Sequence, residues 1–175
     1  AHFSFNHEDL DCDYYTTSLH KWLFAPHGTG LLYVKKDKIQ DLWPLMAASE
    51  AQDHDIRKYE EIGTHPAANY LAIGEAITFH EGIGPERKEA RLKYLNDLWI
   101  DAIIDEPKVS LHTSRDVRFA CGIATVEIKG VDPGELSSRL WKNHNIIVTP
   151  IKHHQFQGIR VTPNVYTTKA EIARF

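Results

Sequence analysis

One lysine lies between two strand-like runs and constrains how the residues around it can fold. Tyr14 to Thr17 has the aromatic and β-branched composition of a strand, and Leu31 to Val34 is a second short apolar run. Lys21 lies in the connection between them, which contains bulky apolar side chains, proline and glycine. The pattern predicts two buried strands and a desolvated lysine on a tight connection, although a lysine is normally strongly hydrated.

Two interpretations of Lys21 follow from the residues alone. Desolvation favours the neutral, nucleophilic amine that a Schiff-base lysine requires. Alternatively, the stem of Lys21 lies on apolar surface while its charged end reaches water. Structural lysines greatly outnumber catalytic ones, so without further information the second interpretation is favoured.

Composition excludes several classes of function. The 175 residues are 42% hydrophobic and 25% charged, which is ordinary for a globular domain. A net charge of −4 offers no basic face for nucleic acid, and no run of cations indicates a membrane surface. No apolar stretch is long enough to span a bilayer. We therefore expect neither a nucleic-acid nor a membrane partner.

The cysteines and histidines give no further site. Cys12 and Cys121 are too few for a disulfide framework, which predicts a reducing, cytoplasmic setting. Among 11 histidines, His153 and His154 are adjacent and would point to opposite faces of a strand. No metal site is expected.

The ends of the chain predict a fragment of a longer protein. The sequence begins at Ala1 without a methionine. Thr168 and Glu171 have the spacing of a capping box that opens a helix, yet the sequence stops at Phe175 after about two turns.

The remaining pattern predicts helices followed by alternating short elements. Residues 35–46 resemble a short amphipathic helix, and two longer helices follow Pro66 and Pro85, the second with a charged, solvated face over residues 86–93. Strands are expected at 109–111, 119–128, 146–148 and 158–162, and helices open at Asp132 and Thr168. This order predicts an α+β layer with helices on one face of a mostly antiparallel sheet.

The run from Asp13 to Tyr33 resembles the lysine segment of the class V aminotransferases, which are fold-type-I enzymes dependent on pyridoxal phosphate. Its core, Ser-Leu-His-Lys-Trp-Leu followed by Ala-Pro-His-Gly-Thr-Gly, is most similar to the isopenicillin-N-epimerase-like branch. The resemblance implies an α/β chain: the end of a large cofactor-binding domain (residues 1–65), linking helices (66–106) and a small C-terminal α+β domain (107–175). The phosphate-binding loop, the ring-stacking side chain and the aspartate that pairs with the ring nitrogen would then precede Ala1.

The same resemblance assigns cofactor-binding residues. Lys21 matches the lysine that forms the Schiff base with the cofactor and then moves the proton at the substrate α-carbon. Ser18 and His20 match positions that bind the cofactor phosphate, although His20 read alone could be a core histidine satisfied by a backbone carbonyl. His27 and Thr29 lie in the glycine loop that reaches the phosphate of the neighbouring subunit.

Arg160 is the expected substrate-binding residue. Gly158 to Tyr166 resembles the small-domain segment whose arginine holds the substrate α-carboxylate, a task suited to a planar guanidinium. Read alone, Arg160 would be an ordinary exposed charge. Cysteine desulfurases carry a nucleophilic cysteine in the loop before this arginine, but residues 152–157 contain none. Cys121 is expected to be an inert buried thiol within a strand.

Two functional hypotheses remain from the sequence. The first is a homodimeric, pyridoxal-phosphate-dependent enzyme of epimerase, transaminase or lyase type, acting through Lys21 at the α-carbon of an amino acid or related amine. The second is a catalytically silent α/β fragment or interaction domain that lacks the rest of the cofactor site.

Overall fold

The computed structural model describes residues 1–175, which fold as two compact units. The first comprises Ala1 and Phe3–Gly84, and the second comprises His2 and Pro85–Phe175. No helix is long and apolar enough to cross a membrane. The three-part division at residues 65/66 and 106/107 stays a prediction.

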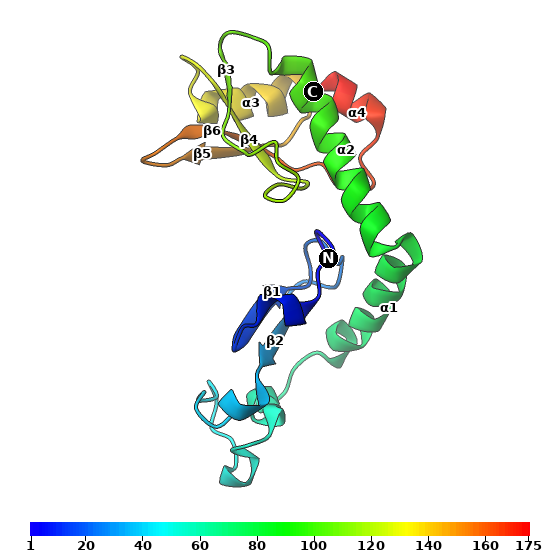
Figure 1. The fold of residues 1–175 in the computed structure, drawn as a ribbon, viewed down its shortest axis with the longest axis vertical. Helices are drawn as coiled ribbons and strands as arrows, with labels where there is room; N and C mark the ends of the chain where they lie inside the picture. Colours follow the sequence, from blue (N-terminus) through cyan, green and yellow to red (C-terminus); the bar gives the residue numbers. More distant parts are fainter. The chain divides into compact units, whose positions relative to one another are not determined.

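The first unit contains the two strands predicted around Lys21. β1 (Tyr14–Ser18) pairs with β2 (Gly30–Val34) (Figure 1). The pairing is antiparallel, with Tyr14 opposite Val34 and Ser18 opposite Gly30. The prediction that these strands are buried was wrong, because Val34 is their only buried residue. A two-stranded sheet shields little surface by itself.

The segment after β2 differs from the predicted helix at 35–46. Only Lys36–Lys38 forms a short 3₁₀ turn there. The Tyr59 hydroxyl lies 3.0 Å from the carbonyl oxygen of Ile39 and 3.1 Å from that of Leu42, so it binds carbonyl groups that a continuous helix would use. Ile39 is buried, but Trp43 and Leu45 are 88% and 99% exposed, so the segment has no continuous buried face. Three other 3₁₀ turns span His7–Leu10, Glu50–Gln52 and Ile56–Glu60.

α1 (Ala67–Ile83) confirms the helix predicted after Pro66. It ends where Gly84 adopts a φ of 90°, a conformation that favours glycine. Only Ala76 of this helix is buried, and it packs with Leu23 and Ala25 in a small core. Ile73 packs partly buried against this core, whereas Leu71, Ile77 and Phe79 of α1 remain exposed.

The second unit contains three helices and one sheet. The helices are α2 (Pro85–Ile103), α3 (Pro133–His144) and α4 (Lys169–Arg174). The strands are β3 (Val109–Leu111), β4 (Ala124–Ile128), β5 (Thr149–Lys152) and β6 (Gln157–Val161). They lie in the order β3-β4-β6-β5, and every neighbouring pair is antiparallel (Figure 1).

One face of this sheet builds the core of the second unit. Alternate residues of β4 and β6 point to the same face, so Val126 and Ile159 pack with Trp99 of α2, and each is 2% exposed. Apolar side chains of α3 and α4 pack against the same cluster. The predicted layer, with helices on one face of an antiparallel sheet, is confirmed.

Three details of the predicted second unit were wrong. Lys88, within the charge run expected to be solvated, is 1% exposed, and burial lowers its pKa. β4 is shorter than the predicted strand at 119–128, and Cys121 is buried but precedes it. The apolar run at 146–148 leads into the core, while the strand itself is Thr149–Lys152.

Both predicted helix starts carry the expected caps. The Asp132 carboxylate accepts hydrogen bonds from the backbone N–H groups of Gly134 (2.8 Å) and Glu135 (3.1 Å) at the start of α3. Its other oxygen lies 2.6 Å from the Lys152 ammonium. Thr168 and Glu171 form the capping box that opens α4.

Candidate active site

The turn that carries Lys21 is closed by its own backbone. The Ala25 N–H donates to the Leu19 carbonyl oxygen over 3.2 Å, and Leu19 N–H donates to the Thr29 carbonyl oxygen over 3.1 Å. Lys21 lies on the turn within this loop, and its side chain is exposed and forms no ion pair. The predicted desolvation of Lys21 was therefore wrong for this chain, because neither β1 nor β2 is covered.

His20 offers an unpaired polar atom beside the lysine. Its Nδ1 atom is buried and has no hydrogen-bond partner. A buried polar atom without a partner is costly, so such an atom indicates a missing partner. The alternative that a backbone carbonyl satisfies His20 does not hold at Nδ1. The ring centroid lies 5.3 Å from that of His27.

The glycine loop between the strands is held by short backbone contacts. The Thr29 hydroxyl donates to the Pro26 carbonyl oxygen over 2.7 Å, and Thr29 is only 3% exposed. The single proton of the Thr29 hydroxyl is therefore already used in a hydrogen bond within the loop. Gly28 has a φ of 83°, and the His27 carbonyl accepts from the Asn69 side chain over 3.2 Å. His27 itself is exposed.

The polar groups of this loop fit an aldehyde cofactor that carries a phosphate. Lys21 supplies an unpaired amine, Ser18 supplies an exposed hydroxyl at the end of β1, and His20 supplies the unpaired Nδ1. Phe24, three residues after the lysine, has a φ of 66°, which is strained for a non-glycine residue. Such strain tends to occur at functional sites.

Arg160 belongs to the second unit, on the sheet face opposite the core. It lies on β6 between Thr125 of β4 and Thr149 of β5. Its Nη2 atom donates to the Thr149 hydroxyl over 3.3 Å, and the guanidinium is exposed and forms no ion pair. Arg160 is thus available to bind an anion.

Two residues on the same face were not found from the sequence. His112 Nε2 lies 2.7 Å from Glu127 Oε2, and this hydrogen bond lowers the pKa of Glu127. Glu127 belongs to β4, and alternation along that strand places it on the face of Thr125 and Arg160. The alternation of side chains along this strand was the only sequence signal for Glu127. The predicted strand at 119–128 was too long and hid this signal.

The hairpin before Arg160 is short and contains no cysteine. The His153 N–H donates to the Phe156 carbonyl oxygen over 3.0 Å and closes the turn between β5 and β6. Cys121 lies elsewhere, and burial raises the pKa of its thiol. A buried thiol with a raised pKa is a poor nucleophile.

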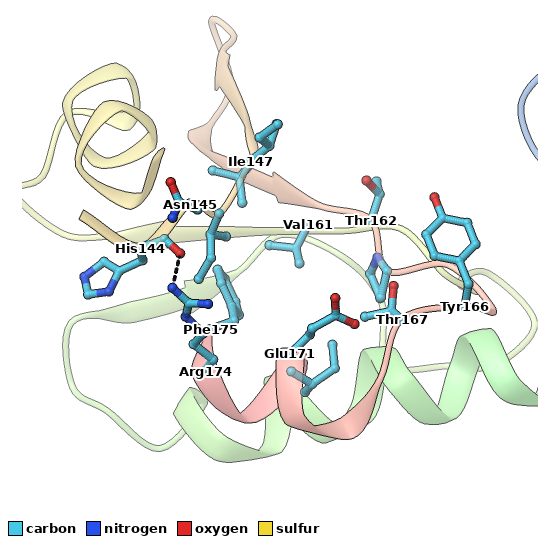
Figure 2. A pocket seen from close by; sticks show the side chains of 14 residues that line it. His144, Asn145, Ile147, Val161, Thr162, Tyr166, Thr167, Glu171, Arg174 and Phe175 are labelled. Carbon is cyan, nitrogen blue, oxygen red and sulfur yellow. Dashed lines mark hydrogen bonds between the residues drawn. The ribbon is translucent and has the colours of Figure 1, made fainter. Parts of the chain in front are cut away.

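A separate cavity of about 280 Å³ lies where α3, β6 and α4 end (Figure 2). Its two charged groups at α4 already have partners: Arg174 donates to the His144 carbonyl oxygen over 2.7 Å (Figure 2), and the Glu171 carboxylate accepts from the Thr168 N–H over 2.7 Å. Val161 lines the cavity from the core face of β6, so the cavity lies on the side of the sheet opposite Arg160.

Comparison with known proteins identifies the family. The model of the aminotransferase class-V family matches residues 1–175. The chain belongs to the class V aminotransferases. It is 29% identical over 182 residues to isopenicillin N epimerase from Streptomyces clavuligerus, covering 94% of this chain and 46% of that protein. The chain therefore spans about half the length of this class V relative.

Solved structures show the same fold. The apo structure of a cysteine desulfurase from Thermococcus onnurineus superposes with a TM-score of 0.82 at 21% identity, over 98% of this chain and 47% of that one. A structure of the C-DES protein, with glycine linked to its pyridoxal phosphate cofactor, gives a TM-score of 0.79 at 17% identity, over 98% and 46%. The expected fold class, part of a pyridoxal-phosphate-dependent transferase, is confirmed.

Proposed function

We propose that this class V chain is part of an enzyme that uses pyridoxal phosphate to act at the α-carbon of an amino acid or related amine. When bound, the cofactor supplies an electron sink for bonds broken at that carbon. The observation that carries the proposal is the exposed, unpaired amine of Lys21 beside the unpaired Nδ1 of His20.

The residues of the first unit have distinct proposed roles. Lys21 holds the cofactor aldehyde and moves the proton at the substrate α-carbon. Ser18 and His20 bind the cofactor phosphate, because a hydroxyl and an imidazole N–H are suitable donors to an anion. His27 and Thr29 shape the glycine loop. Because the Thr29 hydroxyl already donates to Pro26, we propose that this loop approaches a phosphate through its backbone.

Borohydride reduction tests the role of Lys21. The full-length protein, loaded with pyridoxal phosphate, is reduced and digested, and the peptides are mapped by mass spectrometry. We expect the pyridoxyl group on Lys21 and its loss in Lys21→Ala, with Lys35→Ala as the control that keeps the label. A label on any other lysine would contradict the assignment.

Arg160 is proposed to bind the substrate α-carboxylate. A charge-assisted hydrogen bond contributes about 1.5–3 kcal/mol, so Arg160→Ala should lower kcat/KM for amino acids roughly tenfold to a hundredfold. Amines that lack the carboxylate should lose little. Equal losses for both kinds of substrate would reject this role.

Desulfurase chemistry is not proposed. The hairpin turn at residues 153–156 is closed by one backbone hydrogen bond and contains no thiol. Cys121 is buried with a raised pKa, which supports its interpretation as an inert thiol. Epimerisation, transamination and elimination remain the proposed reaction types.

We also propose that the active enzyme is a homodimer. Trp43, Leu45, Leu71 and Phe79 of the first unit are between 56% and 99% exposed, which supports a covered surface in the assembled enzyme. Light scattering of the full-length protein should give twice the mass of one chain, and a monomer would contradict the proposal.

A second candidate function applies to the 175 residues in isolation. The exposed Lys21 and the uncovered strands β1 and β2 favour a catalytically silent fragment. Adding pyridoxal phosphate and recording the visible spectrum before and after dialysis discriminates the two. An absorption band of bound cofactor that persists through dialysis would contradict the silent fragment.

A further inference from the structure

The sheet face that carries Arg160 has one carboxylate within reach of it. Thr125 lies directly opposite Arg160, and Glu127 lies two residues further along β4 on the same face. Diagonal neighbours of this kind are about 7–8 Å apart at the backbone, within reach of long side chains. An arginine and a glutamate so placed can form a cross-strand ion pair.

The structure shows a different pairing. Glu127 Oε2 accepts a hydrogen bond from His112 over 2.7 Å, and Glu127 Oε1 lies 3.5 Å from Gln157 Nε2. Arg160 bonds to the Thr149 hydroxyl on its other side. Both oxygens of Glu127 therefore have partners other than the guanidinium.

The imidazole of His112 is fixed from two directions. Besides its bond to Glu127, its ring centroid lies 5.2 Å from that of Phe156, which in turn lies 5.3 Å from that of His153. Gly158 lies between Phe156 and Arg160 along β6 and presents no side chain to obstruct this packing. The His112–Glu127 contact is thus supported by a ring from the adjacent hairpin.

We propose that His112 is a positioning residue that holds Glu127 away from Arg160 and so keeps the guanidinium available for the substrate carboxylate. This inference rests on the proposed role of Arg160. Because Glu127 is ionised, its release would place a competing carboxylate beside the substrate-binding arginine. His112 thereby favours substrates whose recognised group is a carboxylate.

The pairing of Arg160 can be measured without substrate turnover. Phenylglyoxal modifies free guanidinium groups, and mass spectrometry of the full-length protein gives the rate at each arginine. An exposed ion pair contributes about 0.2–1 kcal/mol, so His112→Ala should slow the labelling of Arg160 by up to roughly fivefold. A slowing of about twofold is the smallest effect that supports the proposal. His112→Gln, which keeps an N–H donor, should label at the rate of the unchanged protein.

A double variant isolates Glu127 as the cause. His112→Ala with Glu127→Gln should restore the labelling rate, because the amide cannot form an ion pair with Arg160. His154→Ala, which removes a neighbouring exposed imidazole, should change nothing, and Arg139 serves as the internal reference. An unchanged rate at Arg160 in His112→Ala, or a slowed rate that Glu127→Gln does not restore, would overturn the proposal.

Glu127→Gln alone keeps His112, so it remains informative even if His112→Ala does not fold. Glu127→Gln alone should leave the labelling rate of Arg160 within about twofold, and a larger rise would show that Glu127 already holds the arginine. Labelling reports the Glu127–Arg160 pairing whether or not Arg160 binds substrate, whereas the Arg160→Ala kinetics report only substrate binding. Failure of this inference and failure of the proposed function are therefore distinguishable.

Discussion

Gly158 allows two strands to approach closely beside Arg160. A Cβ atom at this position would lie 2.3 Å from the Val126 carbonyl oxygen of the neighbouring strand. This distance is far shorter than a van der Waals contact, and the hydrogen bonds of the sheet hold the carbonyl group in place. Only glycine allows β4 and β6 to approach so closely, two residues before the position where Arg160 lies opposite Thr125.

We therefore expect Gly158→Ala to destabilise the second unit by about 3 kcal/mol, since overpacking a rigid site is costly. The melting temperature of this unit should fall by roughly 12–24 °C, measured by calorimetry. Gly74→Ala is the matched control: Gly74 lies within α1 with open space around its Cβ position, so this change should stabilise by about 0.5–1 kcal/mol. Equal effects at both sites would contradict the steric account.

Sequence reasoning located single residues better than it described their surroundings. Motif spacing is local, so it could name Lys21 and Arg160 as candidates, whose roles stay predictions, and the loop around Lys21 forms where predicted. The exposure of Lys21 could not be predicted, because it depends on what covers β1 and β2. The burial of Lys88 was missed for a related reason: a charge run does not reveal which of its members turns toward the protein interior.

At the scale of elements, α3 is tied to the sheet by its N-cap. The Asp132 carboxylate caps the helix and pairs with Lys152 of β5. The bond to Lys152, followed by the backbone bond to Glu135, lowers the pKa of Asp132 from its usual value of 3.8. A lowered folded-state pKa contributes stability above the unfolded value, and this stability is lost as the pH falls through the folded value.

The unfolding midpoint in urea should therefore fall as the pH is lowered below about 4. Asp132→Asn keeps a capping side chain but cannot titrate, so its midpoint should be lower near neutral pH and should converge on that of the unchanged protein in acid. The control is Asp105→Asn, at an exposed aspartate with no capping role. Parallel curves for the unchanged protein and Asp132→Asn from pH 6 to pH 3 would refute the contribution of Asp132.

Errors in the predicted elements have identifiable physical causes. The strand expected at 146–148 lies at Thr149–Lys152 and contains Pro150, which is tolerated because β5 is at the edge of the sheet. The expected helix at 35–46 is replaced by a segment whose carbonyls bind Tyr59, a partner about twenty residues away. Helix caps at Asp132 and Thr168 were predicted correctly because they depend on neighbouring residues alone.

At the scale of the whole molecule, the two units differ in how much core each contains. The second unit buries a cluster that joins its three helices to the strands β3, β4 and β6. The buried cluster of the first unit consists of Leu23, Ala25 and Ala76. Cooperative stability follows buried apolar surface, so the second unit should be the more stable part of the isolated chain.

Hydrogen exchange of the 175-residue chain measures this difference directly. Amides of β4 and β6 should exchange only through global opening of the second unit, whereas amides of β1 and β2 should exchange at least about tenfold faster through local opening. Ile159→Ala should remove about 2–5 kcal/mol of stability and accelerate exchange throughout the core of the second unit, while leaving exchange in β1 and β2 unchanged. Equal protection of all four strands would contradict this picture.

The exposed side chain of Trp43 provides an intrinsic fluorescence signal. Trp43 is 88% exposed in the first unit, whereas Trp99 is 2% exposed in the core of the second. The fluorescence of the first should be accessible to quenchers in solution and that of the second should be shielded. Any molecule that covers the loop around Trp43 would shift its emission toward shorter wavelength, and replacing the half-exposed Trp141 by phenylalanine would remove the other exposed contribution to this signal.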